Sequence, residues 1–328
     1  MNKKWIMIGG SVFVVLIVVF LFVFKSNSLK KTIKEVEEYK EYEMVANMQI
    51  LENDELKSYQ VTSTYASIND FDYYKIELYD KSLNQSQIIV RNGEGVYVLT
   101  PTLNQAFVFQ SDWPNNSFKP YFYHSLVSFL KENKKEKVKD GYIVSGEVSY
   151  ESDPRIKKQE VKFDKSLSPV YVSVFDENDT EIVKLTVSSF KSDLNLTEDA
   201  FKQDLLMKDA KSKYTSVASS LPLYPVALMG STLQNEKTSV INDVTNHILK
   251  FTGNKSFTII ETALSDKDTI DVVHIDGDMI ELLDGIAYSS HNQMTYISSG
   301  IVSSLYSQDL TDNEMLAVLS SMRSPTMK

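Results

Sequence analysis

The sequence predicts an α+β fold: an N-terminal transmembrane helix, a long antiparallel sheet that packs with helices, and then a small α+β domain. Three observations predict it. One uncharged apolar run stands near the N-terminus, most of the remaining chain alternates apolar and polar residues with a period of two, and only short stretches have helical spacing. We divide the chain into an anchor (1–25), a sheet domain (26–206), a linker (207–220) and a small α+β domain (221–328).

The apolar run Trp5–Phe24 carries no charged residue. At about 1.5 Å of rise per residue, a helix over this run is roughly 30 Å long, which matches the hydrocarbon core of a bilayer. No small-residue cleavage pattern follows Phe24, and the run is longer than the usual core of a signal peptide. We therefore expect an uncleaved single-pass anchor in the cell membrane, with the body on the extracytoplasmic side; a cleaved signal peptide is the alternative.

The period-two pattern begins after a short amphipathic helix expected at 26–40. On the first run, Tyr42, Met44, Ala46, Met48 and Ile50 fall on one face of an extended strand. Further strands are expected at 56–68, 71–79, 87–91, 96–100, 106–110, 142–150, 157–164, 170–176 and 181–190. The turn sequence at 92–95, Asn-Gly-Glu-Gly, is typical of a hairpin. Consecutive strands joined by short turns predict an antiparallel meander.

Two helices are expected to interrupt the meander. The segment 121–131 is apolar nearly all round and should lie against the concave side of the sheet, and 197–206 begins with Thr197 as its N-cap. In the small domain we expect strands near 226–233, 248–251, 257–264, 270–275, 279–283, 286–290 and 293–298, and a helix at 311–322. Thr311 and Glu314 have the spacing of a capping box.

Composition excludes several kinds of chemistry. The chain has no Cys, which excludes disulfides, thiolate metal sites and Cys nucleophiles, and its net charge of −10 argues against a nucleic-acid partner. Its four His residues are dispersed, and no nucleophile elbow or phosphate loop is present. His274 stands near three Asp residues, but we interpret Asp276-Gly277 as a hairpin turn with solvated flanks. We predict no catalytic residue, no metal site and no cofactor.

Aromatic residues are concentrated around the expected helix at 121–131, and they form the candidate binding residues. They are Phe107, Phe109, Trp113, Phe118, Tyr121, Phe122 and Tyr123. One interpretation is core packing between the helix and the sheet. The other is the lip and wall of an apolar cavity for an acyl chain, whose burial yields about 0.8 kcal/mol per CH₂ group.

Residues 35–206 resemble the bacterial lipoprotein-carrier (LolA-like) superfamily. The segments that carry the resemblance are EYEMVANMQI, IIVRNGEGVYVLTPTLNQAFVF and LNLTEDAFKQD. It implies a curved antiparallel half-barrel wrapped around helices. Residues 221–323 look like a small α+β domain that follows such half-barrels in Gram-positive extracytoplasmic proteins, in the segments LPLYPVALMG, HILKFTGNKSFTIIETAL and LTDNEMLAVLSSM. The layout is most similar to germination and sporulation lipoproteins of clostridia and bacilli, although this chain has no Cys to carry a lipid.

The resemblance implies a non-enzymatic, membrane-anchored extracytoplasmic binding protein that regulates or scaffolds an envelope or spore-cortex protein. The implied partner is another protein, for example a peptidoglycan amidase. One alternative is a lipid or lipoprotein binding and trafficking protein. Another is an envelope-stress signalling regulator that senses lipoproteins or unfolded chains and acts through an anti-sigma factor.

Overall fold

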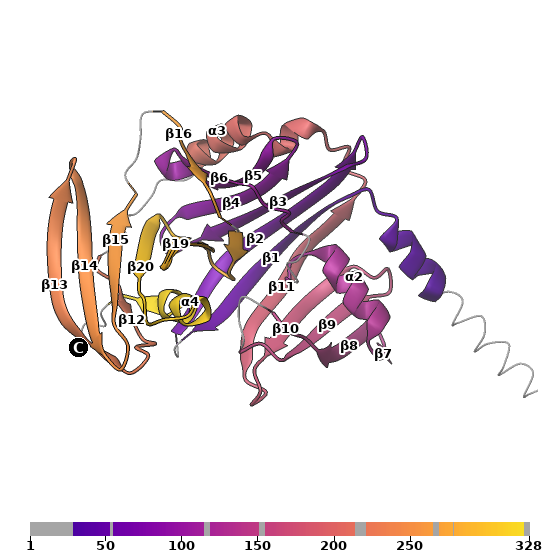
Figure 1. Cartoon of the computed structure of the whole chain (residues 1–328). Helices are drawn as coiled ribbons and strands as arrows, with labels where there is room; N and C mark the ends of the chain where they lie inside the picture. Colours follow the sequence, from indigo (N-terminus) through magenta and orange to yellow (C-terminus); the bar gives the residue numbers. More distant parts are fainter. Residues whose placement is uncertain are drawn as a thin grey trace, which may run out of the picture.

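The computed structural model describes residues 29–52, 55–114, 119–150, 155–213, 221–264, 269–277 and 279–324. Two large sheets and a few helices make up this part of the chain, which confirms the α+β class (Figure 1). The expected anchor at 1–25 lies outside the described residues. No helix within the described ranges is both long enough and apolar enough to cross a membrane.

The first sheet has twelve strands in the order β16-β6-β5-β4-β3-β2-β1-β11-β10-β9-β8-β7. The strands are β1 (Glu41–Glu52), β2 (Glu55–Ile68), β3 (Phe71–Asp80), β4 (Gln85–Asn92), β5 (Gly95–Thr100), β6 (Gln105–Phe109), β7 (Lys135–Val138), β8 (Gly141–Glu147), β9 (Lys158–Asp164), β10 (Pro169–Phe175), β11 (Glu181–Ser192) and β16 (Asp271–Ile275). All of them except β16 pair antiparallel. Ten of these eleven strands were predicted and β7 was not, and the pairing of β1 with β11 joins the meander β1–β6 to the meander β7–β11. The sheet curls without closing, as a half-barrel does (Figure 1).

The concave face of the half-barrel carries the larger core. The predicted apolar face of β1 is confirmed, because Tyr42, Met44, Ala46, Met48 and Ile50 are each at most 2% exposed. Helix α2 (Tyr123–Glu132), predicted at 121–131, packs on this face. The backbone N–H of Tyr123 donates to the Tyr42 hydroxyl at 3.2 Å, so helix and sheet are joined by a buried hydrogen bond as well as by apolar contact.

A second helix covers the opposite face of the same sheet. Successive residues of β4 alternate between the two faces: Ile89 belongs to the concave core, whereas Ile88 and Val90 pack with Met207 and Ala210 of the helix. This helix differs from the prediction at 197–206. A 3₁₀ turn, η1 (Pro101–Leu103), follows β5, and a second, η2 (Glu198–Phe201), precedes α3 (Gln203–Lys213). Residues 207–213 were expected in the linker but belong to this helix, because Met207 and Ala210 pack against apolar residues of the sheet.

The second sheet has seven strands in the order β13-β14-β15-β20-β19-β18-β17. They are β13 (Ser231–Ile241), β14 (Val244–Gly253), β15 (Phe257–Ala263), β17 (Met279–Glu281), β18 (Ile286–Ser290), β19 (Gln293–Ser298) and β20 (Ile301–Tyr306). Helix α4 (Asp312–Ser320) packs on it, and β12 (Tyr224–Pro225) pairs with β21 (Met322–Arg323) in a two-stranded ladder. The predicted capping box of Thr311 and Glu314 is confirmed.

The C-terminal part of the chain differs from the prediction in three ways. Strand β13 extends to Ile241 because Asn242 and Asp243 both adopt positive φ and turn the chain into β14. Strands β20, β12 and β21 were not predicted. Strand β16, expected in the small domain, instead pairs parallel with β6 of the half-barrel (Figure 1). Asp276-Gly277 is therefore not a hairpin turn, because it connects strands of two different sheets.

Candidate binding site at the junction of the two sheets

The six described aromatic candidates lie in one core cluster on the concave side of the half-barrel. Phe107, Phe109, Trp113, Tyr121, Phe122 and Tyr123 are each at most 5% exposed. Phe118 lies outside the described residues. The core-packing interpretation describes these contacts, and a role as the wall of an acyl-chain cavity stays a prediction.

Two of these aromatic residues bind a buried carboxylate that the sequence analysis did not single out. Trp113 Nε1 donates to Glu281 Oε2 at 2.7 Å, and the Tyr121 hydroxyl donates to Glu281 Oε1 at 2.6 Å. Lys119 Nζ donates to the backbone carbonyl of Glu281 at 2.7 Å. Burial and the adjacent carboxylate raise the pKa of Tyr121, so its hydroxyl remains a donor. Glu281 belongs to β17, and this network therefore fixes the second sheet to the half-barrel.

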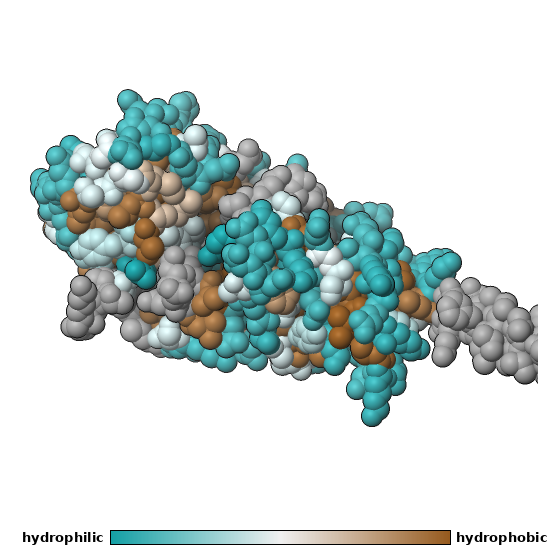
Figure 2. All heavy atoms as spheres, turned by 90° about the horizontal axis from the view of Figure 1, so that it is seen from below, coloured by the Kyte–Doolittle hydropathy of each residue, from teal (hydrophilic) through white to brown (hydrophobic). Residues whose placement is uncertain are grey.

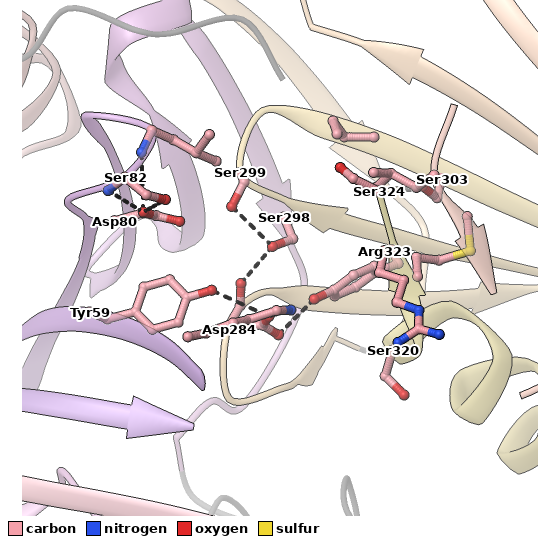
Figure 3. Close-up of a pocket in the computed structure, with 16 residues that line it drawn as sticks. Tyr59, Asp80, Ser82, Asp284, Ser298, Ser299, Ser303, Ser320, Arg323 and Ser324 are labelled. Carbon is pink, nitrogen blue, oxygen red and sulfur yellow. Dashed lines mark hydrogen bonds and ion pairs between the residues drawn. The ribbon is translucent and has the colours of Figure 1, made fainter. Parts of the chain in front are cut away.

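A pocket of about 450 Å³ lies beside this junction and is lined by both sheets (Figure 3). From the half-barrel come Lys57 and Tyr59 on β2, Asp80 at the end of β3, and Ser82 and Leu83 in the following turn. From the C-terminal part come Leu223, Asp284, Tyr296, Ser298, Ser299, Ile301, Ser303, Ser320, Met322, Arg323 and Ser324. The volume lies within the range of roughly 300–1,000 Å³ that is common for small-molecule sites.

Asp284 is the polar centre of the pocket. It stands in the turn between β17 and β18, and its carboxylate accepts hydrogen bonds from Lys57 Nζ at 2.8 Å, the Tyr296 hydroxyl at 2.7 Å and the Tyr59 hydroxyl at 3.4 Å. Burial by itself would raise the pKa of Asp284, but the Lys57 ammonium and these hydroxyls outweigh burial and hold the pKa below its ordinary value. Asp284 is therefore ionised, and its charge is neutralised by Lys57.

The remaining charged groups of the pocket are Asp80 and Arg323. Asp80 Oδ1 caps the turn after β3, accepting from the backbone N–H groups of Ser82 and Leu83 at 2.8 and 3.2 Å and from the Ser82 hydroxyl at 2.6 Å. Arg323 is held by the β12–β21 ladder through its backbone. Among the described residues, its guanidinium forms no hydrogen bond or ion pair.

A second buried carboxylate lies directly behind the pocket wall. Glu261 on β15 is fully buried and accepts from the Leu223 backbone N–H at 2.9 Å and from the Ser303 hydroxyl at 3.5 Å. Burial raises the pKa of Glu261 to about 7, although these two hydrogen bonds lower it. Leu223 and Ser303 both line the pocket, so Glu261 holds two residues of the wall by hydrogen bonds.

The polar lining of the pocket consists of hydroxyl groups and four charged side chains. No histidine is among the described residues that line it, and the described part of the chain holds no group of three or more His, Asp or Glu placed to bind a metal ion. Sequence reasoning missed this site because its charged residues are far apart along the chain. Asp284-Gly285 is a turn dipeptide, a signal that predicts a hairpin rather than a binding residue.

Comparison with known proteins supports the resemblance stated for the sequence. The chain is 29% identical over 307 residues to the sporulation protein YdcC of Bacillus subtilis, covering 90% of this chain and 89% of that protein. No protein-family model matches the chain. Among solved structures, the MucA/MucB complex of Pseudomonas aeruginosa is 12% identical with a TM-score of 0.32, covering 91% of this chain and 98% of that one.

A LolA superfamily protein from Nitrosomonas europaea is 10% identical with a TM-score of 0.28, covering 51% of this chain and 92% of that one. The expected similarity to a sporulation protein of a bacillus is confirmed by the curated relative. These TM-scores lie below 0.5, so the description of the fold rests on the strands and helices of this chain alone.

Proposed function

We propose that the chain is a non-enzymatic binding protein that acts in sporulation, with the anchor 1–25 in the membrane and the body outside the cytoplasm. The name of the curated relative supports the role in sporulation. The observation that carries the binding role is the pocket of about 450 Å³ at the junction of the two sheets.

The arrangement of groups in the pocket favours binding over catalysis. Serine hydroxyls line it in number, but a serine nucleophile needs an adjacent base that can take its proton. Asp284, the buried carboxylate of the pocket, already accepts hydrogen bonds from Lys57 and two tyrosine hydroxyls. Its oxygens are therefore committed to fixed donors, which suits a preorganised recognition surface.

Blocking the pocket tests this proposal. Ser320 is at the end of α4 and lines the pocket, so Ser320→Trp fills it, and Ser82→Trp fills it from the half-barrel side. Ser188→Trp on the exposed surface of β11 is the matched control. In a strain that lacks the native protein, we expect wild type and Ser188→Trp to restore spore formation and both pocket variants to fail, with melting temperatures alike. Full restoration by both pocket variants would refute the proposal.

We further propose that a protein partner binds the tip of the β13–β14 hairpin. Here Val240, Ile241 and Val244 are 65%, 59% and 37% exposed, and β13 pairs only with β14 among the described strands. This tip is drawn at the upper left of Figure 1, whereas Figure 2, seen from below, shows further hydrophobic surface on the lower side of the same unit. An open strand edge with apolar residues can accept an extended segment of another protein as an added strand. A peptidoglycan amidase is our candidate partner.

The partner proposal is tested by co-purification from sporulating cells. The paired substitution Val240→Ser and Ile241→Ser should abolish recovery of the partner. Val272→Ser with Val273→Ser is the matched control, because these valines are 40% and 37% exposed on β16 at the edge of the other sheet. Recovery of an anti-sigma factor in place of a cell-wall enzyme would favour the envelope-stress alternative. Equal recovery with both pairs would refute a role for the hairpin tip.

The acyl-chain alternative is less well supported. The aromatic rings that would line an acyl cavity are packed against one another and against α2 and the sheet. A chain of CH₂ groups could enter only by displacing contacts that already bury these rings. Mass spectrometry of lipids extracted from the purified full-length protein tests this, and stoichiometric lipid would reverse our preference.

A further inference from the structure

We propose that the junction pocket binds a small zwitterionic ligand, one that carries both a carboxylate and an ammonium group, as a short peptide with free ends does. This inference rests on the proposed binding function and names the class of ligand. The charges that line the pocket, and the way some of them are already paired, support it.

Four charged side chains line the pocket: Lys57, Asp80, Asp284 and Arg323. Lys57 and Asp284 neutralise each other, with 2.8 Å between Nζ and Oδ2. Asp80 and Arg323 remain, one negative and one positive. They come from different sheets, and no ion pair joins them to each other or to any other described residue. In Figure 3 they lie well apart, with Ser298 and Ser299 drawn between them.

Each of these two groups has a preferred partner. The planar guanidinium of Arg323 presents a fork of N–H donors that matches a carboxylate in geometry and charge. Asp80 uses Oδ1 to cap its turn, and Oδ2 forms no hydrogen bond with the described residues, so one carboxylate oxygen is left for an ammonium. A ligand with one charge of each sign therefore pairs both groups at once, whereas a simple anion or cation pairs only one.

The region between the two charges fits the body of such a ligand. The Ser298 hydroxyl donates to the Asp284 backbone carbonyl at 2.8 Å, so its oxygen can accept from a peptide N–H, and the Ser299 hydroxyl lies 3.5 Å from it. Leu83, Ile301 and Met322 supply an apolar wall for short side chains. The pocket thus offers charged groups, hydroxyl oxygens and hydrocarbon together, which a peptide backbone with small side chains requires.

Calorimetric titration of the full-length protein in mild detergent tests the inference with three probes: trialanine, N-acetyl-trialanine and trialanine amide. We expect trialanine to bind and each cap to weaken binding at least tenfold, because each cap removes one ionic contact. Arg323→Gln should lower the affinity for trialanine at least tenfold, and this variant should bind trialanine amide and free trialanine with equal affinity. Asp80→Asn, which keeps the Oδ1 acceptor of the turn, should lose only the preference for a free amine.

Three results would overturn the inference. The first two are no binding of trialanine by the wild type, and binding by the wild type that is indifferent to both caps. The same holds if Arg323→Gln and Asp80→Asn respond to the caps as the wild type does. None of these results refutes the proposed function if Ser320→Trp and Ser82→Trp fail to restore spore formation. Restoration by those variants refutes the function itself, so the two failures are distinguishable.

Discussion

Removing the buried carboxylate of Glu281 should destabilise the protein strongly. In Glu281→Leu, Trp113 Nε1–H and the Tyr121 hydroxyl lose their acceptors at 2.7 and 2.6 Å while remaining buried. An unsatisfied buried donor costs about 1–3 kcal/mol, and the leucine side chain recovers part of this by apolar burial. We expect a net loss of about 3 kcal/mol in the free energy of unfolding, a large share of the roughly 5–15 kcal/mol typical of proteins.

The assay is urea unfolding of the full-length protein in mild detergent, followed by circular dichroism and by tryptophan fluorescence. Glu147→Leu is the control, since Glu147 is exposed on β8. A double-mutant cycle with Trp113→Phe should give a coupling of at least about 1 kcal/mol, because the two residues share a hydrogen bond. The reasoning would be refuted if Glu281→Leu unfolded at the same urea concentration as Glu147→Leu.

Three further predictions concern stability. In the folded protein the pKa of Glu261 is about 7, above its ordinary value of 4.5, so the folded state holds a proton that the unfolded state releases. The free energy of unfolding should therefore fall by about 3 kcal/mol as pH rises from 4.5 to 7. Glu261→Gln should remove this fall in urea titrations at several pH values. Asp284→Ala should cost about 2 kcal/mol in the same assay, because Lys57 is left without its partner but stays one-third exposed. Thr311→Ala should cost about 1 kcal/mol and Thr311→Ser almost nothing, since only the alanine removes the cap of α4; equal melting of both would contradict this.

Local patterns in the sequence predict most strands of the half-barrel. The alternation from Tyr42 to Ile50 predicts a strand with one buried face, and the turn at 92–95 predicts the β4–β5 hairpin, because both signals depend only on neighbouring residues. The capping box at Thr311 is equally local. These elements are confirmed for the same physical reason, namely that short-range periodicity and turn chemistry decide them.

What the sequence does not predict depends on contacts between distant segments. Strand β16 carries an ordinary strand pattern, and nothing within 270–275 distinguishes pairing with β6 from pairing inside the small domain. The helix α3 continues to Lys213 because Met207 and Ala210 find apolar partners on the sheet, whereas 207–220 by itself is polar. Propensity is a weak guide where tertiary contacts decide the outcome.

The binding site shows the same limit. Lys57, Asp80, Asp284 and Arg323 meet only because the second sheet docks on the half-barrel, and no motif of fixed spacing joins them. The aromatic candidates were conspicuous in the sequence because they are clustered along the chain. In the structure, Trp113 and Tyr121 support the junction by holding Glu281, while the pocket itself is lined by other residues.

The most direct test of the central claim, that the junction pocket is a binding site, is capture of small molecules from sporulating cells. A low-molecular-weight extract is passed over immobilised full-length protein, and the retained compounds are identified by mass spectrometry. We predict at least one compound that is retained by wild type and by Ser188→Trp but lost with Ser320→Trp. Retention of the same compounds by all three proteins, or of none by the wild type, would contradict the claim.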